Sequence, residues 1–440
     1  MPGTPQSGTL GRGRVPRVPR VTPAARVAVA SLCGTAIEFY DFYIYGTAAA
    51  LVLGGVFFPG LDPVAARLAA FSTFAVAFVA RPLGSALFGH RGDRAGRAST
   101  LVVSLLVTGL PTAAIGLLPG YAEIGVAAPV LLVLLRLAQG AGLGGEWGGA
   151  ALLAAEHAPP GRRGRHAMFP QLGPPVGFVA ANGCFLVLGA ALTEEEFAGW
   201  GWRLPFVAAL PFVAVGLYVR LRVREAPVFR AAVDGGRVAR VPLAGLLRHQ
   251  WRRVLLGAGA MTIAYTLFYT ATTSCLAYGT TTLGLPRTTM LALTLAGVGV
   301  MAVGTAASAA ASDRFGRRRV LVTGAALAAV WGPVMFPLME TRSVPLVGVA
   351  LGGALGLMGL TFGPMGAYLP ELFRTEFRYS GASVAYSLGG VLGGAVPPLV
   401  ATGLQAWGGG AAVGGYVGVT AVLSLLCLLA LPETRGHALD

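Results

Sequence analysis

The sequence predicts an all-α membrane protein with twelve transmembrane helices in two six-helix bundles. Of its 440 residues, 55% are hydrophobic and only 12% are charged, and the mean hydropathy is +0.69. A soluble domain carries about 25% charge, so lipid must surround most of this chain. The short charged motif Asp-Arg-x-Gly-Arg occurs at 93–97 and again, half a chain length later, at 313–317. Each copy stands between two long apolar stretches, which indicates two bundles of like topology.

Twelve stretches are long and apolar enough to cross a bilayer, which takes about 20 residues. In chain order they are 27–54, 64–90, 98–118, 124–154, 163–192, 203–221, 252–280, 288–311, 320–338, 345–369, 378–403 and 412–431. They group into an N-terminal bundle at 27–221 and a C-terminal bundle at 252–431. Residues 1–26 are predicted to be a disordered basic tail, 222–251 a cytoplasmic linker and 432–440 a short cytoplasmic tail.

The charge pattern predicts how the chain lies in the membrane. All 33 basic residues are arginines, and most fall on one side, in the two tails, the linker and the loops that hold the charged motif. The positive-inside rule places that side, and both termini, in the cytoplasm. Topology therefore accounts for the net charge of +15, and we expect no nucleic-acid partner. Two arginines, Arg81 and Arg136, stand inside predicted spans.

The sequence offers no sign of enzyme chemistry. The four cysteines are scattered through apolar spans, and the five histidines show no metal-ligand spacing. There is no nucleotide-binding loop and no cluster of catalytic residues. We expect no metal, no cofactor other than a proton, and a monomer surrounded by lipid.

Charged residues inside the spans are the first candidates for function, because each costs about 2.5–3.5 kcal/mol on insertion scales. Glu38 and Asp41 share one face of the first span near mid-bilayer, and a desolvated carboxyl group there can bind and release a proton. The alternative is a permanent ion pair with an arginine. Glu146 is the next proton candidate. Arg81 and Arg136 offer planar forks that suit a carboxylate substrate, or else serve an intramolecular pair.

Polar and aromatic side chains at helical spacing predict a hydrophilic cavity between the bundles. Such groups can hydrogen-bond a small acid, although any one of them could equally link two helices. The candidate substrate-binding residues besides the two arginines are Gln139, Gln171, Asn182, Tyr265, Tyr269 and Tyr386.

At this point the sequence resembles the major facilitator superfamily, through the two charged motifs, and within it the metabolite:proton symporters. The narrower resemblance is carried by the segments 34–46, 81–90, 136–149, 200–206 and 370–381. It is strongest to the shikimate-transporter branch. It implies a proton-coupled symporter of a bacterial inner membrane, which imports a small carboxylate-bearing metabolite, such as shikimate, a di- or tricarboxylate or a betaine, by alternating access. In the superfamily fold spans one, four, seven and ten line the cavity, which would place Arg136 opposite Glu38 and Asp41.

The resemblance also implies a gate at the cytoplasmic side, built from charge clusters that the two halves repeat. Glu156 precedes Arg163 at the same spacing at which Glu371 precedes Arg378. A proton-driven exporter, or a sensor that kept the fold and lost transport, remains open as an alternative. The predicted gating residues are Asp93, Arg97, Glu156, Asp313, Arg317 and Glu371.

Overall fold

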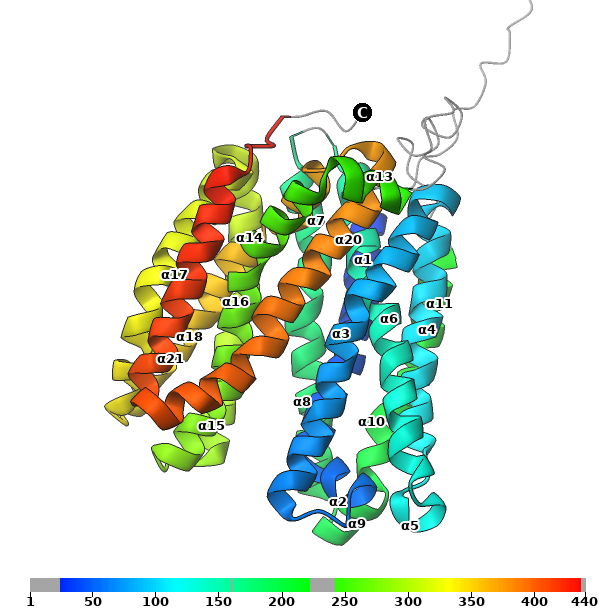
Figure 1. The fold of residues 1–440 in the computed structure, drawn as a ribbon, viewed down its shortest axis with the longest axis vertical. Coiled ribbons are helices and arrows are strands. Elements are labelled where there is room, and N and C mark those ends of the chain that lie inside the picture. Colours follow the sequence, from blue (N-terminus) through cyan, green and yellow to red (C-terminus); the bar gives the residue numbers. More distant parts are fainter. Residues whose placement is uncertain (1–23, 160, 222–241, 437–440) are drawn as a thin grey trace, which may run out of the picture.

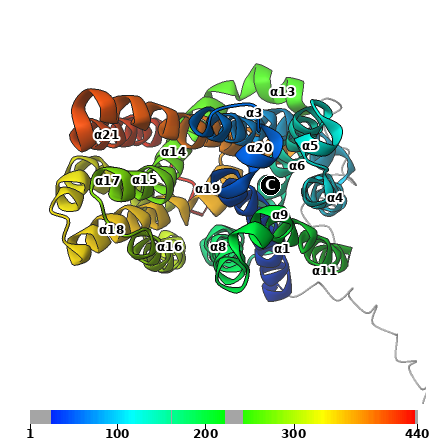
Figure 2. The ribbon, with the colours of Figure 1, turned by 90° about the horizontal axis from the view of Figure 1, so that it is seen from below.

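A computed structural model describes residues 24–159, 161–221 and 242–436 of the chain. Long helices run along the longest axis of the molecule and form two groups (Figure 1). Seen along that axis the groups lie side by side, with α3 and α20 neighbours where they meet (Figure 2). Residues 1–23 and 222–241, for which the sequence predicts a disordered tail and most of the linker, lie outside the described residues.

The first group holds six predicted spans, several of which are bent or broken. Its long helices are α1 (Ala24–Ala48), which continues through a π-helical turn into α2 (Gly54–Phe57), then α3 (Pro63–Ala95), α4 (Arg97–Leu117), α6 (Ala127–Glu156), α7 (Arg163–Gln171) with α8 (Gly173–Ala191), and α10 (Leu204–Val207) with α11 (Ala209–Leu221). The short helices α5 (Tyr121–Ile124) and α9 (Glu194–Gly199) lie in its loops.

The second group begins inside the predicted linker. A short helix, α13 (Pro242–His249), lies there where the sequence predicts only a connection. The helices that follow are α14 (Trp251–Tyr269), α15 (Cys275–Ala277), α16 (Arg287–Phe315), α17 (Arg317–Glu340), α18 (Val344–Phe362), α19 (Met365–Glu371), α20 (Arg378–Gly390) and α21 (Val396–Ala430). The last one is interrupted at Gly408 and Gly409, where φ reaches +64° and the chain turns between spans eleven and twelve.

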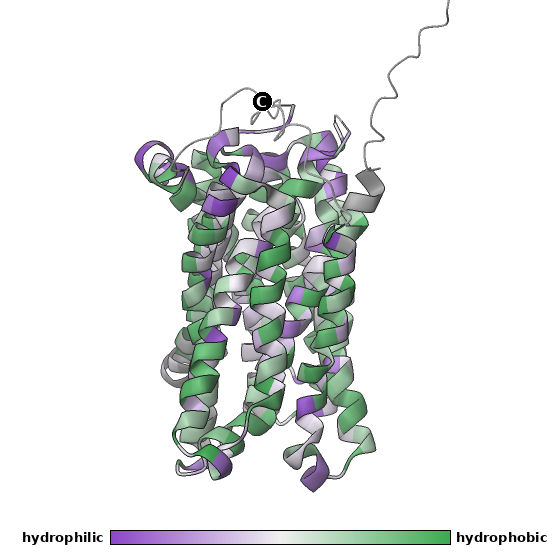
Figure 3. Cartoon of the chain, turned by 90° about the vertical axis from the view of Figure 1, so that its right-hand side faces the viewer, coloured by the Kyte–Doolittle hydropathy of each residue, from purple (hydrophilic) through white to green (hydrophobic). Residues whose placement is uncertain are grey.

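The twelve predicted spans and the fold class are confirmed. Within the described residues, ten helices are long and apolar enough to cross a membrane, and the bent pair Ala28–Ala48 and Leu51–Phe57 makes an eleventh. The remaining segment, α20 and the start of α21, is helical but less apolar, because it buries Arg378, Ser383 and Ser387. Hydrophobic residues dominate the length of the helices and hydrophilic ones gather toward the two ends (Figure 3).

The two charged motifs adopt the same backbone conformation. Gly96 breaks the chain between α3 and α4 with φ 108° and ψ 149°, and Gly316 does so between α16 and α17 with φ 101° and ψ 148°. An L-residue rarely adopts a positive φ, which explains the glycine in both motifs. We call the end of the molecule that holds these motifs and residues 432–436 the arginine-rich end. It is at the top of Figure 1.

Candidate functional site

A buried pair of opposite charges lies where the two bundles meet. Glu38 on α1 and Arg81 on α3 are each 1% exposed, and an Nη2 to Oε1 distance of 3.8 Å separates them. Neither oxygen of Glu38, nor Nε and Nη1 of Arg81, has a hydrogen-bond partner among the described residues. The guanidinium carbon lies 5.4 Å from the ring centroid of Phe42 and 5.6 Å from that of Phe78, within the usual range of a cation–π contact. Aromatic rings therefore surround the Arg81 guanidinium group, and its Nε and Nη1 donors are free to bind a ligand.

Tyrosines from the second bundle complete the surroundings of Arg81. The ring of Tyr386 on α20 lies 5.8 Å from the guanidinium carbon and 5.4 Å from the ring of Tyr265 on α14, and Tyr269 stacks on Tyr265 at 6.4 Å. Trp147 of the first bundle stacks on Tyr386 at 3.8 Å. Tyr386 therefore lies beside Arg81, Tyr265 and Tyr269 follow it in a row of rings, and this cluster includes residues of both bundles. Sequence reasoning missed Trp147, whose signal was its place in the segment 136–149.

Asp41 and Arg136 belong to a separate set inside the first bundle. The Arg136 guanidinium carbon lies 3.7 Å from the Tyr45 ring centroid, and Arg136 donates hydrogen bonds to Gln139 and, at 3.5 Å, to the Thr73 carbonyl. No ion pair joins it to Glu38 or Asp41 in the described part of the chain. Arg136 thus faces α1, the helix of both acids, but through the Tyr45 ring, and an aromatic face and neutral oxygens surround its guanidinium group.

Gln139 and Asp41 are tied together through the backbone. Gln139 donates to the Thr112 hydroxyl at 2.7 Å and to the Asp41 carbonyl at 3.3 Å. The Asp41 carboxylate accepts no hydrogen bond of regular geometry within the described residues, and the Thr112 hydroxyl is a near polar neighbour. The first bundle therefore buries a second carboxyl group one helical turn from Glu38.

Glu146 has a partner that the sequence did not suggest. It forms an ion pair with Arg220 of α11, which also donates to the Leu101 carbonyl at 2.6 Å. Arg220 stands at the end of the predicted span 203–221 and is only 6% exposed. Gly34 leaves space for its guanidinium group, where a Cβ would overlap it.

The other two predicted amides, Gln171 and Asn182, have different surroundings. Gln171 is buried, accepts from the Trp147 indole at 2.5 Å and donates to the Phe362 carbonyl of the second bundle at 2.7 Å. It thus links the central aromatic rings to both bundles. Asn182 is half-buried and hydrogen-bonds within its own bundle, to the Phe178 carbonyl at 3.0 Å and from the Thr47 hydroxyl at 3.4 Å.

At the arginine-rich end, two aspartates cap helices of the opposite bundle. Asp93, at the end of α3, accepts the backbone N–H groups of Tyr379 at 3.1 Å and Ser380 at 3.0 Å, and the Ser380 hydroxyl at 2.8 Å. Asp313, at the end of α16, accepts the N–H groups of Gly164 at 2.9 Å and Arg165 at 3.0 Å. A carboxylate at a helix N-terminus satisfies free N–H groups and complements the helix dipole. In each half of the chain, an aspartate of the motif thus caps a helix of the other half.

Ion pairs across the bundles accompany the caps. Arg378 lies 3.5 Å from Glu156, and Arg163 lies 3.8 Å from Glu371. Arg317 lies 3.5 Å from Glu371 and 2.7 Å from Asp313. The predicted gating acids are therefore brought together at one end. Arg317 was itself a predicted gating residue and pairs within the second bundle, whereas Arg163 and Arg378 join the bundles and were not among the predicted gating residues. The side chain of Arg97 lies outside the described part of the structure.

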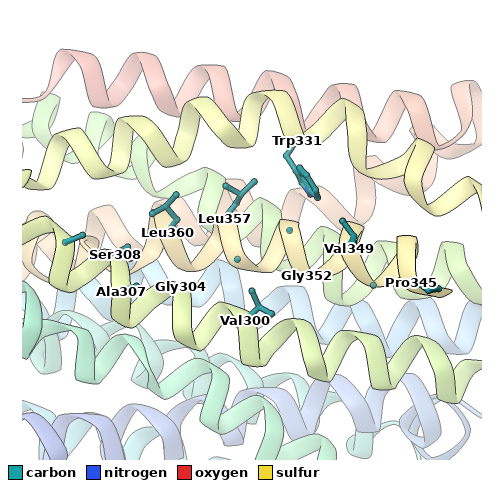
Figure 4. Close-up of a pocket in the computed structure, with 14 residues that line it drawn as sticks. Val300, Gly304, Ala307, Ser308, Trp331, Pro345, Val349, Gly352, Leu357 and Leu360 are labelled. Carbon is teal, nitrogen blue, oxygen red and sulfur yellow. The ribbon is translucent and has the colours of Figure 1, made fainter. Parts of the chain in front are cut away.

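An apolar groove of about 830 Å³ lies apart from both regions (Figure 4). It is formed by α16, α17 and α18, and its walls include Val300, Trp331, Val349 and Leu357. Val300 and Val349 are about half exposed. Because it lacks charged side chains, we assign this groove to the lipid-facing surface and not to substrate binding.

Two helical bundles with a buried polar site where they meet are the architecture of a secondary transporter of the membrane. The comparisons agree: the chain belongs to the family described as "Sugar (and other) transporter", which matches residues 27–246 and 243–440. It is thus a transporter of the major facilitator superfamily and not an enzyme.

Three similar proteins illustrate the relationship. The inner membrane metabolite transport protein YhjE of Escherichia coli K12 is 50% identical over 94% of this chain and 95% of its own length. The shikimate transporter of the same organism is 37% identical over 91% and 90%. The xylose symporter XylE, in the structure with 6-bromo-6-deoxy-D-glucose, superposes with a TM-score of 0.76 at 17% identity, over 95% of this chain and 98% of XylE. The chain is therefore a multi-pass inner-membrane metabolite transporter, as the sequence predicted.

Proposed function

We propose that this transporter is a proton-coupled symporter that imports a small carboxylate-bearing metabolite by alternating access. The observation that carries the proposal is Arg81, a fully buried guanidinium with unused donors, facing Glu38 and the tyrosines of the opposite bundle. Shikimate, a di- or tricarboxylate, or a betaine would fit this chemistry. The similarity to a shikimate transporter supports the same substrate class.

The chemistry of Arg81 favours a carboxylate over a neutral sugar. A buried cation without hydrogen bonds is unfavourable, and a substrate carboxylate would supply both the charge and two parallel acceptors. The hydroxyl groups of Tyr265, Tyr269 and Tyr386 can bind hydroxyl or carbonyl oxygens elsewhere on the same molecule. Both bundles would then contact one substrate, so substrate binding would change how the two bundles are placed relative to each other.

Glu38 links the proton to the substrate in this proposal. While ionised, Glu38 is the near counter-charge of Arg81, at 3.8 Å. A proton on Glu38 would remove that counter-charge and leave Arg81 to the substrate carboxylate. Protonation and substrate binding then favour each other, as a symporter requires. Asp41 is the second candidate because its carboxylate is also buried, whereas Glu146 is engaged by Arg220.

The arginine-rich end would be the cytoplasmic gate. The positive-inside rule places this end and both termini in the cytoplasm. The caps made by Asp93 and Asp313 hold it closed in this conformation, and they must break when the bundles rock to the inward-open state. Because each cap joins one bundle to the other, the two would open together.

Uptake into proteoliposomes tests the function. We expect labelled shikimate, α-ketoglutarate, citrate or betaine to accumulate when the outside is more acidic than the lumen, and to stop accumulating when a protonophore collapses the gradient. Accumulation that is insensitive to the protonophore would refute proton coupling. Accumulation only under a reversed gradient would indicate an exporter.

A further inference from the structure

Helix α13 lies across the junction of the two bundles at the arginine-rich end (Figure 1). It contacts α3 of the first bundle, and α20 and the turn at 375–377 of the second. Its inner face is tightly packed: Leu246 is fully buried, and a Cβ on Gly245 would lie 2.5 Å from the Phe377 ring. Any ligand of α13 therefore acts on both bundles at once.

The outer face of α13 and the start of α14 combine apolar and basic side chains. Leu247 is 54% exposed, Trp251 48% and Leu255 55%, and Arg248 and Arg252 are exposed among them. We call these five residues the α13–α14 patch. The Arg252 guanidinium carbon lies 5.5 Å from the Trp251 ring centroid. Neither arginine forms an ion pair or hydrogen bond with the described residues.

Arg253, the residue after Arg252, has a structural role and serves as a comparison. It donates to the Leu372 carbonyl at 2.6 Å, beyond the end of α19, and so fastens α14 to its own bundle. Arg248 and Arg252 have no such partner within residues 24–159, 161–221 and 242–436, so the described fold does not explain their presence. Trp251 and Leu247 are large apolar side chains left uncovered beside them.

The position of the patch in the membrane points to its ligand. Leu255 belongs to a helix that spans the bilayer, so its exposed side chain faces lipid. Trp251 stands one turn nearer the end of the molecule, at the headgroup level where tryptophan is enriched. Exposed guanidinium groups at that level match phosphate in charge and geometry. The patch is thus apolar on the side of the acyl chains and cationic on the side of the headgroups.

We propose that the α13–α14 patch binds an anionic phospholipid. Arg248 and Arg252 hold the phosphate, and Leu247, Trp251 and Leu255 lie against the glycerol and the upper acyl chains. Because α13 contacts both bundles, the bound lipid stabilises the conformation that is closed at this end. This site is independent of the proton and substrate site proposed above.

Thermal unfolding of the purified full-length protein in neutral detergent tests the proposal. Added phosphatidylglycerol should raise Tm more than phosphatidylcholine does, and inorganic phosphate should not raise it. Each arginine near an anionic surface contributes about 1 kcal/mol, so the double substitution Arg248→Gln, Arg252→Gln should weaken lipid binding ~30-fold and abolish most of the specific rise. The matched control is Arg287→Gln, Arg342→Gln, which removes two exposed arginines from the opposite end and should keep the full rise.

Two further results decide the matter. Trp251→Ala, which leaves the charge unchanged, should reduce the rise that phosphatidylglycerol produces, since the patch loses its apolar part. An undiminished rise in the Arg248, Arg252 double variant, or an equal rise with inorganic phosphate, would overturn the proposal. In the first case the lipid binds elsewhere, and in the second the ligand is a free anion.

Discussion

Replacing Asp93 by asparagine should open the arginine-rich end and stop transport. Asp93 accepts three hydrogen bonds from the start of α20, two from backbone N–H groups and one from the Ser380 hydroxyl. Asparagine keeps one acceptor oxygen but loses the charge and at least one of these bonds. A hydrogen bond to a charged group contributes about 1.5–3 kcal/mol and the helix dipole about 0.3–1 kcal/mol. The closed state should lose about 2–4 kcal/mol, which shifts the equilibrium by between ~30-fold and ~1,000-fold.

A distance measurement can report this shift directly. Spin labels at positions 94 and 374, both exposed at the arginine-rich end and on opposite bundles, should move apart in Asp93→Asn. Substrate affinity should change little, because Asp93 does not contact the central site, while turnover is lost. Asp313→Asn should behave alike but more mildly, since Asp313 caps α7 with two N–H groups and is less buried.

The matched control is Asp62→Asn at the opposite end. Asp62 accepts the N–H of Ala65 at 3.1 Å and thus caps its own helix, α3. Its substitution should leave both the label distance and transport near the wild-type values. An unchanged distance distribution in Asp93→Asn, or a large rise in the substrate dissociation constant with turnover intact, would refute the gating role.

Three further predictions follow from the central site and the motif glycines. Glu38→Gln or Asp41→Asn should abolish gradient-driven accumulation but leave counterflow, which needs no net proton release; if both variants still concentrate substrate, the proton site lies elsewhere. Arg81→Lys should weaken substrate binding about tenfold, because the fork geometry is lost although the charge remains, and methyl esters of the substrate should fail to compete with wild-type uptake; full competition by an ester would show that Arg81 does not bind the carboxylate. Gly316→Ala should lower the stability by about 1–3 kcal/mol because φ 101° and ψ 148° define a backbone region that residues other than glycine hardly ever adopt, whereas Gly415→Ala, in open space on a helix, should not; equal melting temperatures would contradict the strain argument.

The sequence alone determined the class of protein and the course of the chain. Lipid cannot satisfy backbone hydrogen bonds, so each crossing must be a helix of about 20 apolar residues, and hydropathy reveals it. Gly96 and Gly316 are visible in the sequence as matching positions of the repeated motif. Their shared positive φ explains why both copies of the motif have glycine there. The residues of a short segment are enough to predict features of this kind, because each depends on that segment alone. The helix α13 escaped prediction because its eight residues are far too few to cross the bilayer, so a search for membrane spans passes over it.

Only the tertiary structure decided which charged groups meet. Arg81 and Arg136 look equivalent in sequence, but the first faces Glu38 and the opposite bundle and the second packs on Tyr45 inside its own. Arg220 stands at the end of a predicted span, and only the structure shows Glu146 and the space beside Gly34 around it. The partners of a buried charge come from other helices, far along the chain, and their approach depends on packing. Spacing along one helix predicts which residues lie on the same face. The packing of the neighbouring helices determines which residues that face contacts.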